Sequence, residues 1–137
     1  MHQKMSASLT SVIQDRTIYE DLEIFAKNLY RIGKLSQRDW DNYCGLFKVM
    51  NFYLKRPDLI IYLKADTDTL LKRIKKRGRD YESLIDPEYI HTLNISYDRW
   101  IESISDQSVV IIETDYFNIY EDAEAFNNIQ KDILKRL

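Results

Sequence analysis

The stretch Leu59-Ile60-Ile61-Tyr62-Leu63, which Pro57 introduces, is apolar or aromatic at every position. A strand that is apolar on both faces is typical of a parallel sheet that helices cover on both sides. A second run of this kind, Val109-Val110-Ile111-Ile112, follows further along the chain. Short apolar strands that alternate with long helices predict parallel βαβ units, so we expect an α/β sandwich.

The helices are predicted from apolar side chains that recur at helical spacing. Ser36 is expected to cap one helix together with Asp39, while Gly33 and Gly78 are expected to end two others. The helical segments are 1–9 (the end of a helix), 19–31, 36–55, a segment that begins at Asp66 or Thr67, 89–105 after Asp86-Pro87-Glu88, and 121–137. The inward side chains are expected to be Leu22, Phe25, Ala26 and Leu29; Trp40, Tyr43, Leu46, Phe47, Met50 and Tyr53; Tyr89, Ile90, Leu93, Tyr97 and Trp100; and Phe126, Ile129 and Ile133.

The composition predicts one domain over residues 1–137, because 45% of the 137 residues are hydrophobic. A formal net charge of −2 argues against an overall basic surface for nucleic acid or membranes. The single cysteine, Cys44, is read as a packing residue; it excludes an internal disulfide and fits a reducing compartment, so we expect a cytoplasmic protein. No apolar run is long enough to span a bilayer, and the N-terminus has no signal-peptide core.

The segment from Leu70 to Glu82 reads L-L-K-R-I-K-K-R-G-R-D-Y-E and is densely basic. Arg73 and Arg77 are four residues apart and share one helix face, and Arg79 follows the predicted helix end. Guanidinium groups aimed at one region repel each other unless an anion lies between them. Arginine suits phosphate because it can form two parallel hydrogen bonds to it. A solvated basic helix face is the alternative interpretation.

Polar residues follow the predicted strands. The short apolar stretch Val12-Ile13 runs into Asp15 and Arg16, and we expect it to be a buried strand. Glu113 to Asp115 follow the last apolar run. Because the C-terminal ends of parallel strands face one crevice, we expect these residues and the arginine segment to converge. Asp15 could hold Mg²⁺ through water, and Arg16 could neutralise a phosphoryl group in transfer. A structural ion pair between these two residues is an equal alternative.

Several motifs in chain order make the sequence resemble the deoxynucleoside kinase family. I-Q-D-R-T-I-Y-E-D (Ile13 to Asp21) looks like the family's D/E-R-S motif, with threonine in place of serine. The segments at 57–63 (P-D-L-I-I-Y-L) and 73–82 (R-I-K-K-R-G-R-D-Y-E) resemble its fourth strand and its arginine lid, and Y-I-x-x-L-N-x-x-Y-D-x-W (89–100) continues the match. The resemblance covers nearly the whole chain and is nearest to bacterial deoxyadenosine/deoxyguanosine kinases. It implies a P-loop kinase-like fold, which is a three-layer αβα sandwich with a parallel sheet.

The resemblance also implies a role for each matching residue. ATP, Mg²⁺ and a deoxynucleoside would be the ligands, and packed helices would form a homodimer. Asp21, which taken alone would complement the helix dipole, would hydrogen-bond the base. The other implied roles are Asp15 near Mg²⁺, Arg16 on the 5′ oxygen and the phosphates, Arg73, Arg77 and Arg79 as lid residues over the ATP phosphates, Glu82 on the sugar 3′-hydroxyl, and Asp115, Tyr116 and Phe117 beside the ATP base.

The sequence departs from the family in lacking a G-x-x-x-x-G-K-[ST] phosphate loop. Its only glycines are Gly33, Gly45 and Gly78, and none lies in such a loop. The chain therefore looks like the C-terminal two-thirds of a kinase, with the N-terminal strand and the phosphate loop missing, and we expect it to be nearly inactive alone. In the family that strand lies between the runs at 12–13 and 59–63. Unpaired buried backbone groups cost about 1–3 kcal/mol each, so the gap must be filled. The two flanking strands could close onto each other, but we expect another chain or a longer polypeptide to supply the strand.

Two other functions stay open at this point. A thymidylate-kinase-like nucleotide kinase shares the D-R and lid layout, although Asp21 and Glu82 argue against it. A non-catalytic binding or assembly module is supported only by the missing phosphate loop.

Overall fold

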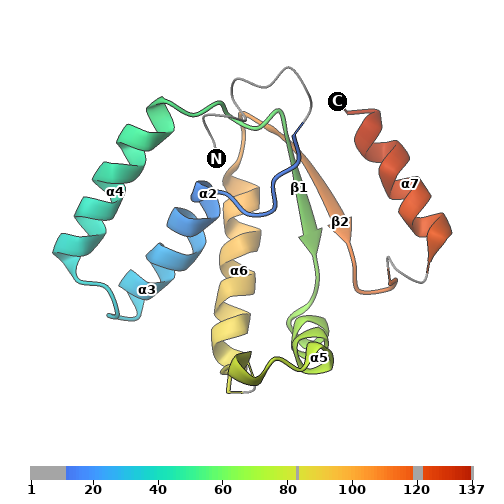
Figure 1. Ribbon diagram of the computed structural model, residues 1–137, viewed down its shortest axis with the longest axis horizontal. Helices are drawn as coiled ribbons and strands as arrows, with labels where there is room; N and C mark the ends of the chain where they lie inside the picture. Colours follow the sequence, from blue (N-terminus) through green and yellow to red (C-terminus); the bar gives the residue numbers. More distant parts are fainter. Residues whose placement is uncertain (1–11, 83, 119–121, 137) are drawn as a thin grey trace. The chain divides into compact units, whose positions relative to one another are not determined.

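The computed structural model describes residues 12–82, 84–118 and 122–136 (Figure 1). The chain divides into two compact units, Met1–Arg56 and Pro57–Leu137. The helix end expected at residues 1–9 lies outside the described residues. Among the described residues, no helix has the length and apolarity that crossing a membrane requires.

The first unit begins with one continuous helical segment that contains a π-helical stretch. It consists of α2 (Ile18–Glu20), the π-helix η1 (Asp21–Ala26) and α3 (Lys27–Arg31). The Thr17 N–H donates to the Glu20 carboxylate at 2.7 Å, which satisfies a backbone donor at the helix start. Gly33 ends the helix with a φ of 71°, and the next N–H, from Lys34, donates to the Leu29 carbonyl at 2.8 Å.

The π-helical stretch changes which side chains of this segment face inward. Leu22 and Ala26 are buried as predicted, but Ile24 is the most buried side chain at 0% exposure, and Leu29 is exposed, contrary to prediction. A π-helix contains more residues per turn than an α-helix. The apolar face therefore rotates relative to the α-helical spacing on which the prediction rested.

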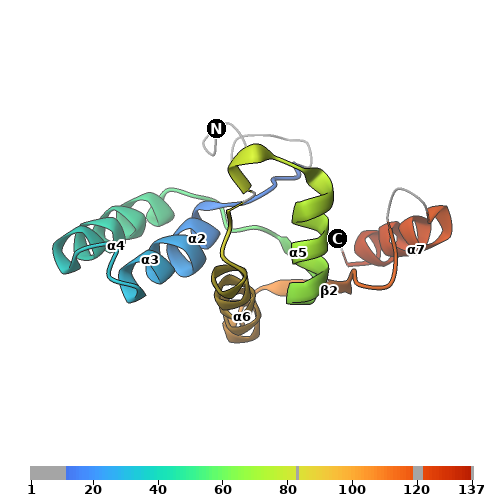
Figure 2. The ribbon, with the colours of Figure 1, turned by 90° about the horizontal axis from the view of Figure 1, so that it is seen from below.

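Helix α4 (Gln37–Phe52) runs beside α2 and α3 (Figures 1 and 2). Ser36 caps it as predicted, because its hydroxyl accepts from the Asp39 N–H at 3.2 Å. The Tyr19 hydroxyl donates to the Asn51 side chain at 2.8 Å, and the ring of Tyr30 stacks on that of Trp40 at 5.2 Å. These aromatic contacts join the helices of the first unit.

The predicted inner face of α4 is largely exposed. No residue of α4 is buried, and Leu46 is 60% exposed. Tyr43, Met50 and Tyr53 are exposed too, so this part of the prediction is wrong. The physical reason is that helical spacing identifies an apolar face but not its partner, and α2 to α3 cover only part of this one.

The second unit contains a two-stranded parallel sheet of β1 (Leu59–Lys64) and β2 (Ser108–Glu113). The register pairs Leu59 with Ser108 and Lys64 with Glu113, which confirms the predicted parallel pairing. Between the strands lie α5 (Thr67–Arg77), the 3₁₀ turn η2 (Asp80–Glu82) and α6 (Pro87–Ser103). The ring of Tyr62 on β1 stacks on that of Tyr97 on α6 at 6.1 Å. After β2 comes α7 (Ala123–Leu134).

Two predictions about buried faces are wrong in this unit. Leu63 is 58% exposed, and Ile61 and Ile111 are also exposed, so the described helices do not cover the whole sheet. Helix α7 is shorter than predicted, and Phe126 on its predicted inner face is exposed. An apolar strand sequence favours burial, but a strand is buried only where a neighbouring helix or strand packs against it.

The predicted buried strand at Val12-Ile13 is wrong as well. Residues 12–14 are irregular, and Ile13 is 95% exposed. A strand is stable only when a neighbouring strand satisfies its backbone groups. Within the part of the chain that the structure describes, only β1 and β2 pair.

Replacing Ile24 by alanine should destabilise the first unit strongly. The side chain is fully buried, so the truncation removes apolar burial and leaves a cavity, at a cost of about 2–5 kcal/mol. Leu134→Ala serves as the control, because Leu134 is exposed and its truncation should cost less than about 1 kcal/mol. Urea unfolding measures both variants, and equal losses would contradict the core assignment.

Candidate functional site

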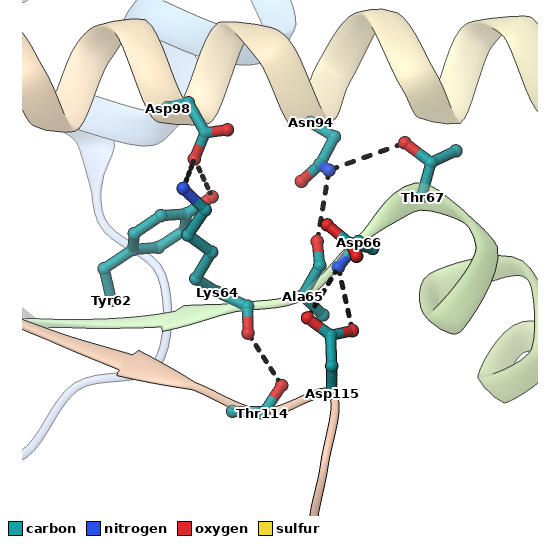
Figure 3. Close-up of polar contacts among 9 residues, drawn as sticks. All are labelled: Tyr62, Lys64, Ala65, Asp66, Thr67, Asn94, Asp98, Thr114 and Asp115. Atoms are coloured by element: carbon teal, nitrogen blue, oxygen red, sulfur yellow. Dashed lines mark hydrogen bonds and ion pairs between the residues drawn. The ribbon is translucent and has the colours of Figure 1, made fainter.

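The junction between β1 and α5 is held by hydrogen bonds from two directions (Figure 3). The side-chain amide of Asn94, on α6, donates to the Ala65 carbonyl at 3.1 Å. The N–H of Asp66 donates to both carboxylate oxygens of Asp115, at 3.0 and 3.2 Å. Asp66 occupies the N-cap position of α5 as predicted, but its side chain makes no capping hydrogen bond. The Asp115 carboxylate therefore satisfies a donor at the start of the helix.

The carboxylate of Asp115 lies in a favourable setting for a negative charge. A hydrogen bond from the Thr69 side chain, followed by the Asp66 N–H and the Arg73 guanidinium, holds the pKa of Asp115 below its usual value. Asp115 thus stays ionised and complements the positive end of the α5 dipole.

Arg73 is attached to the loop that follows β2. Its guanidinium donates to the Thr114 hydroxyl at 2.9 Å and also to the Thr114 carbonyl. Thr114 is buried, and its N–H and hydroxyl both donate to the Lys64 carbonyl, at 2.8 and 2.9 Å. In this structure Arg73 therefore joins α5 to the end of the sheet.

Asp98 on α6 binds two residues of β1 (Figure 3). The Tyr62 hydroxyl donates to its carboxylate at 3.1 Å, and the Lys64 ammonium lies 3.5 Å from the same oxygen. Burial, and then the negative charge of Asp98, raise the pKa of Tyr62 far above its ordinary value. The neutral phenol is thus the form that the fold favours.

The arginines at the end of α5 converge on a carboxylate. Gly78 ends the helix in the left-handed conformation, with a φ of 65°. The Arg77 guanidinium then forms a two-pronged hydrogen bond to Glu82, with distances of 2.7 and 3.0 Å. Arg79 lies 3.5 Å from the same carboxylate, whose side chain is only 9% exposed. Glu82 is therefore the anion between these two guanidinium groups.

In the first unit, Arg16 lies in a strained backbone conformation. Its φ is 60°, a region that residues other than glycine rarely occupy. The Gln14 side chain donates to the Arg16 carbonyl at 2.7 Å, and the guanidinium carbon lies 5.4 Å from the centre of the Phe25 ring. Strain of this kind is typical of functional positions. Asp15 next to it is exposed.

Asp21 is exposed at the start of the π-helix. Burial, and then the charge of Asp21, raise the pKa of the Tyr43 hydroxyl on α4. A carboxylate in this position is accessible to a hydrogen-bond donor, while it also complements the dipole of the first helical turn.

The structure brings some of the predicted site residues together within the second unit. Arg77, Arg79 and Glu82 form one cluster, while Arg73 meets the loop that carries Asp115. In that loop Tyr116 is exposed and Phe117 is half-buried. The convergence of Asp15, Arg16 and Asp21 with the lid stays a prediction. No cluster of three His, Cys, Asp or Glu side chains suited to a metal occurs among the described residues.

Sequence reasoning missed Asn94, Asp98 and Thr67 as residues of this region. The hydroxyl oxygen of Thr67, the first residue of α5, lies 3.2 Å from Nδ1 of His91 and 3.5 Å from the side-chain amide nitrogen of Asn94. A signal was available, because Asn94 and Asp98 are four residues apart on a helix that presents apolar residues to the core. Polar side chains at that spacing on an inner face indicate buried hydrogen-bond partners.

A family model described as deoxynucleoside kinase matches residues 1–137. The deoxyadenosine kinase of Dictyostelium discoideum is 44% identical over 93 residues, which are 68% of this chain and 38% of that protein. The deoxyadenosine/deoxycytidine kinase of Bacillus subtilis is 34% identical over 123 residues, which are 88% of this chain and 57% of that protein. The chain thus spans between about two-fifths and three-fifths of the length of these two relatives.

Solved structures agree with this similarity. A structure of the deoxyadenosine kinase from M. mycoides, with the products dCMP and a flexible dCDP bound, matches with a TM-score of 0.76 and 32% identity. The match covers 96% of this chain and 68% of that one. The elements described above therefore have the α/β fold of a P-loop kinase, as predicted.

Replacing Tyr62 by phenylalanine should lower the free energy of unfolding at neutral pH. It should also make that free energy fall less steeply as the pH rises above about 10. The raised pKa means that Tyr62 contributes stability below its unfolded pKa of about 10, and that the contribution is lost as the pH rises toward the folded pKa. Loss of the hydrogen bond to Asp98 should cost about 1 kcal/mol. Urea unfolding from pH 7 to pH 11 measures both effects. The control Tyr53→Phe, at an exposed position, should lose unfolding free energy with rising pH as steeply as the wild type. An equally steep loss in Tyr62→Phe would contradict the role assigned to Tyr62.

Proposed function

This chain belongs to the deoxynucleoside kinase family, and we propose that the protein transfers the γ-phosphoryl group of ATP to the 5′-hydroxyl of a deoxynucleoside. Deoxyadenosine or deoxyguanosine is the preferred acceptor. The names of two similar deoxyadenosine kinases support the first, and a relative named deoxyguanosine kinase supports the second. In this proposal residues 1–137 belong to one domain, and residues 73–82 form its lid.

The observation that carries the proposal is the cluster of Arg77, Arg79 and Glu82. The Arg77 guanidinium binds the Glu82 carboxylate through two parallel hydrogen bonds, and the same geometry suits a phosphate. The proposal is that the ATP phosphates take the place of the carboxylate between these arginines. Glu82 is then free to accept a hydrogen bond from the sugar 3′-hydroxyl.

Arg16 and Asp15 would act at the transferring group. Arg16 contacts the 5′ oxygen and the phosphates, where its positive charge stabilises the charge that develops in the transition state. Mg²⁺ requires only one or two protein carboxylates when phosphate oxygens and water complete its shell, and the exposed Asp15 fits that donor set. When bound, Mg²⁺ supplies charge neutralisation to the phosphates.

Asp21 would select the base, since its exposed carboxylate can accept a hydrogen bond from an exocyclic amino group. Arg73 lies at the N-terminal end of the lid, and residues 115–117 border the ATP base.

We also propose a homodimer through packed helices, which the exposed apolar side chains Leu46 and Met50 on α4 support. A non-catalytic module would bind nucleotides without turnover, so a phosphoryl-transfer assay of the complete protein separates it from a kinase.

Replacing Arg16 by alanine in the complete protein should lower kcat on the order of a hundredfold, because the residue acts on developing charge. The KM for either substrate should change much less. A coupled assay with ATP and deoxyadenosine measures these constants. Arg38→Ala, which removes an exposed arginine of α4, is the matched control. A kcat loss of equal size in the control would contradict the role of Arg16.

Replacing Asp21 by alanine should reduce discrimination among deoxynucleosides by about tenfold or more, the worth of a hydrogen bond to a charged group. The KM for ATP should stay close to the wild-type value. Comparing kcat/KM for deoxyadenosine, deoxyguanosine, deoxycytidine and thymidine measures the change, and Asp41→Ala on α4 serves as the control. Unchanged discrimination together with weaker ATP binding would overturn the assignment of Asp21.

A further inference from the structure

The hydrogen bonds at the end of β1 act on a single peptide unit. The carbonyl of Ala65 and the N–H of Asp66 belong to the same peptide plane, which connects the strand to α5. Asn94 binds the carbonyl at 3.1 Å from α6, and Asp115 binds the N–H at 3.0 Å from the loop after β2 (Figure 3). Ala65 is buried, so its carbonyl depends on a protein donor. The orientation of this plane is therefore constrained from both sides.

The orientation of this peptide sets the direction in which α5 leaves the sheet. Arg77 lies ten residues after Thr67, the first residue of α5. At a rise of about 1.5 Å per residue, the helix places it roughly 15 Å from its start, so a tilt of about 10° moves Arg77 by roughly 2.6 Å. A displacement of about 1 Å in a positioning group can cost on the order of a hundredfold in rate.

We propose that Asn94 and Asp115 are positioning residues for the arginines of α5. They fix the Ala65–Asp66 peptide, and through it the place of Arg73 and Arg77 over the phosphates of ATP. The inference rests on the proposed function for what the arginines bind. The inference also assigns a structural role to the N-x-x-Y-D part of the motif on α6. Asn94 binds the peptide before α5, while Asp98 binds Tyr62 and Lys64 of β1.

The same region couples the loop after β2 to α5. Asp115 binds the Asp66 N–H, and Arg73 of α5 binds Thr114 beside it. A change at Asp115 or Arg73 therefore acts both on α5 and on the loop proposed to border the ATP base. The expected consequence is a larger defect on the ATP side of the reaction than on the deoxynucleoside side, which, among the described residues, α5 reaches only through Glu82.

Asn94→Leu in the complete protein tests the inference, because leucine has similar volume but cannot donate to the Ala65 carbonyl. The KM for ATP should rise on the order of tenfold or more, and the KM for deoxyadenosine should rise clearly less. Ser96→Ala is the matched control, since it removes a hydrogen bond that lies within α6, from the Ser96 hydroxyl to the Thr92 carbonyl. A purely structural role would lower the yield or the stability and leave both KM values of the folded enzyme unchanged, and that result would overturn the inference.

Substitutions of Asp115 provide the second test, which also applies if Asn94→Leu does not fold. Asp115→Ala should raise the KM for ATP, and Asp115→Asn should restore part of the loss because its amide oxygen still accepts from the Asp66 N–H. Equal defects in the two variants would contradict the positioning role.

Hydrogen exchange separates this inference from the proposed function, because it requires no activity. In wild-type protein the Asp66 amide should be protected, and both Asp115→Ala and Asn94→Leu should increase exchange in the first turn of α5. Normal exchange in these variants would overturn the inference even if the protein is an active kinase. Faster exchange in a protein without phosphoryl transfer would overturn only the proposed function.

Discussion

The parallel pairing of β1 and β2 is the constraint on which the second unit depends. Two parallel strands cannot be joined by a tight turn, so the chain must cross over between them, and here it does so through α5 and α6. The crossover leaves the C-terminal ends of both strands at the same edge of the sheet. Thr114 at the end of β2 binds the Lys64 carbonyl at the end of β1, which joins the two ends directly.

The edge created in this way collects polar groups for a physical reason. Backbone groups at a strand end lose their ladder partners and must find others. Asn94 and Asp115 supply those partners at the Ala65–Asp66 peptide, and Thr114 does so for Lys64. Residues that satisfy the backbone and residues proposed to bind ATP therefore lie in the same short segments, so a substitution there can affect stability and catalysis together.

The lid illustrates how a cluster of like charges is accommodated. Arg77 and Arg79 lie close enough to repel each other, and Glu82 reduces that repulsion by accepting hydrogen bonds from Arg77 and lying 3.5 Å from Arg79. Because Arg77 and Arg79 are about half exposed, such a pair contributes little to stability, roughly 0–1 kcal/mol. A low stability of this contact suits an arrangement in which phosphate oxygens replace the carboxylate.

The sequence by itself determined the strands at 59–63 and 109–112, their parallel pairing, the helix caps at Ser36 and Gly78, and the family. These features depend on local periodicity, on turn chemistry and on motifs, all of which are written in consecutive residues. Only the tertiary structure decided which apolar faces are covered, that Val12-Ile13 is not a strand, and that Asn94 and Asp115 hold one peptide between them. These features depend on which distant segment lies opposite a given residue, and a pattern within one segment carries no information about its partner.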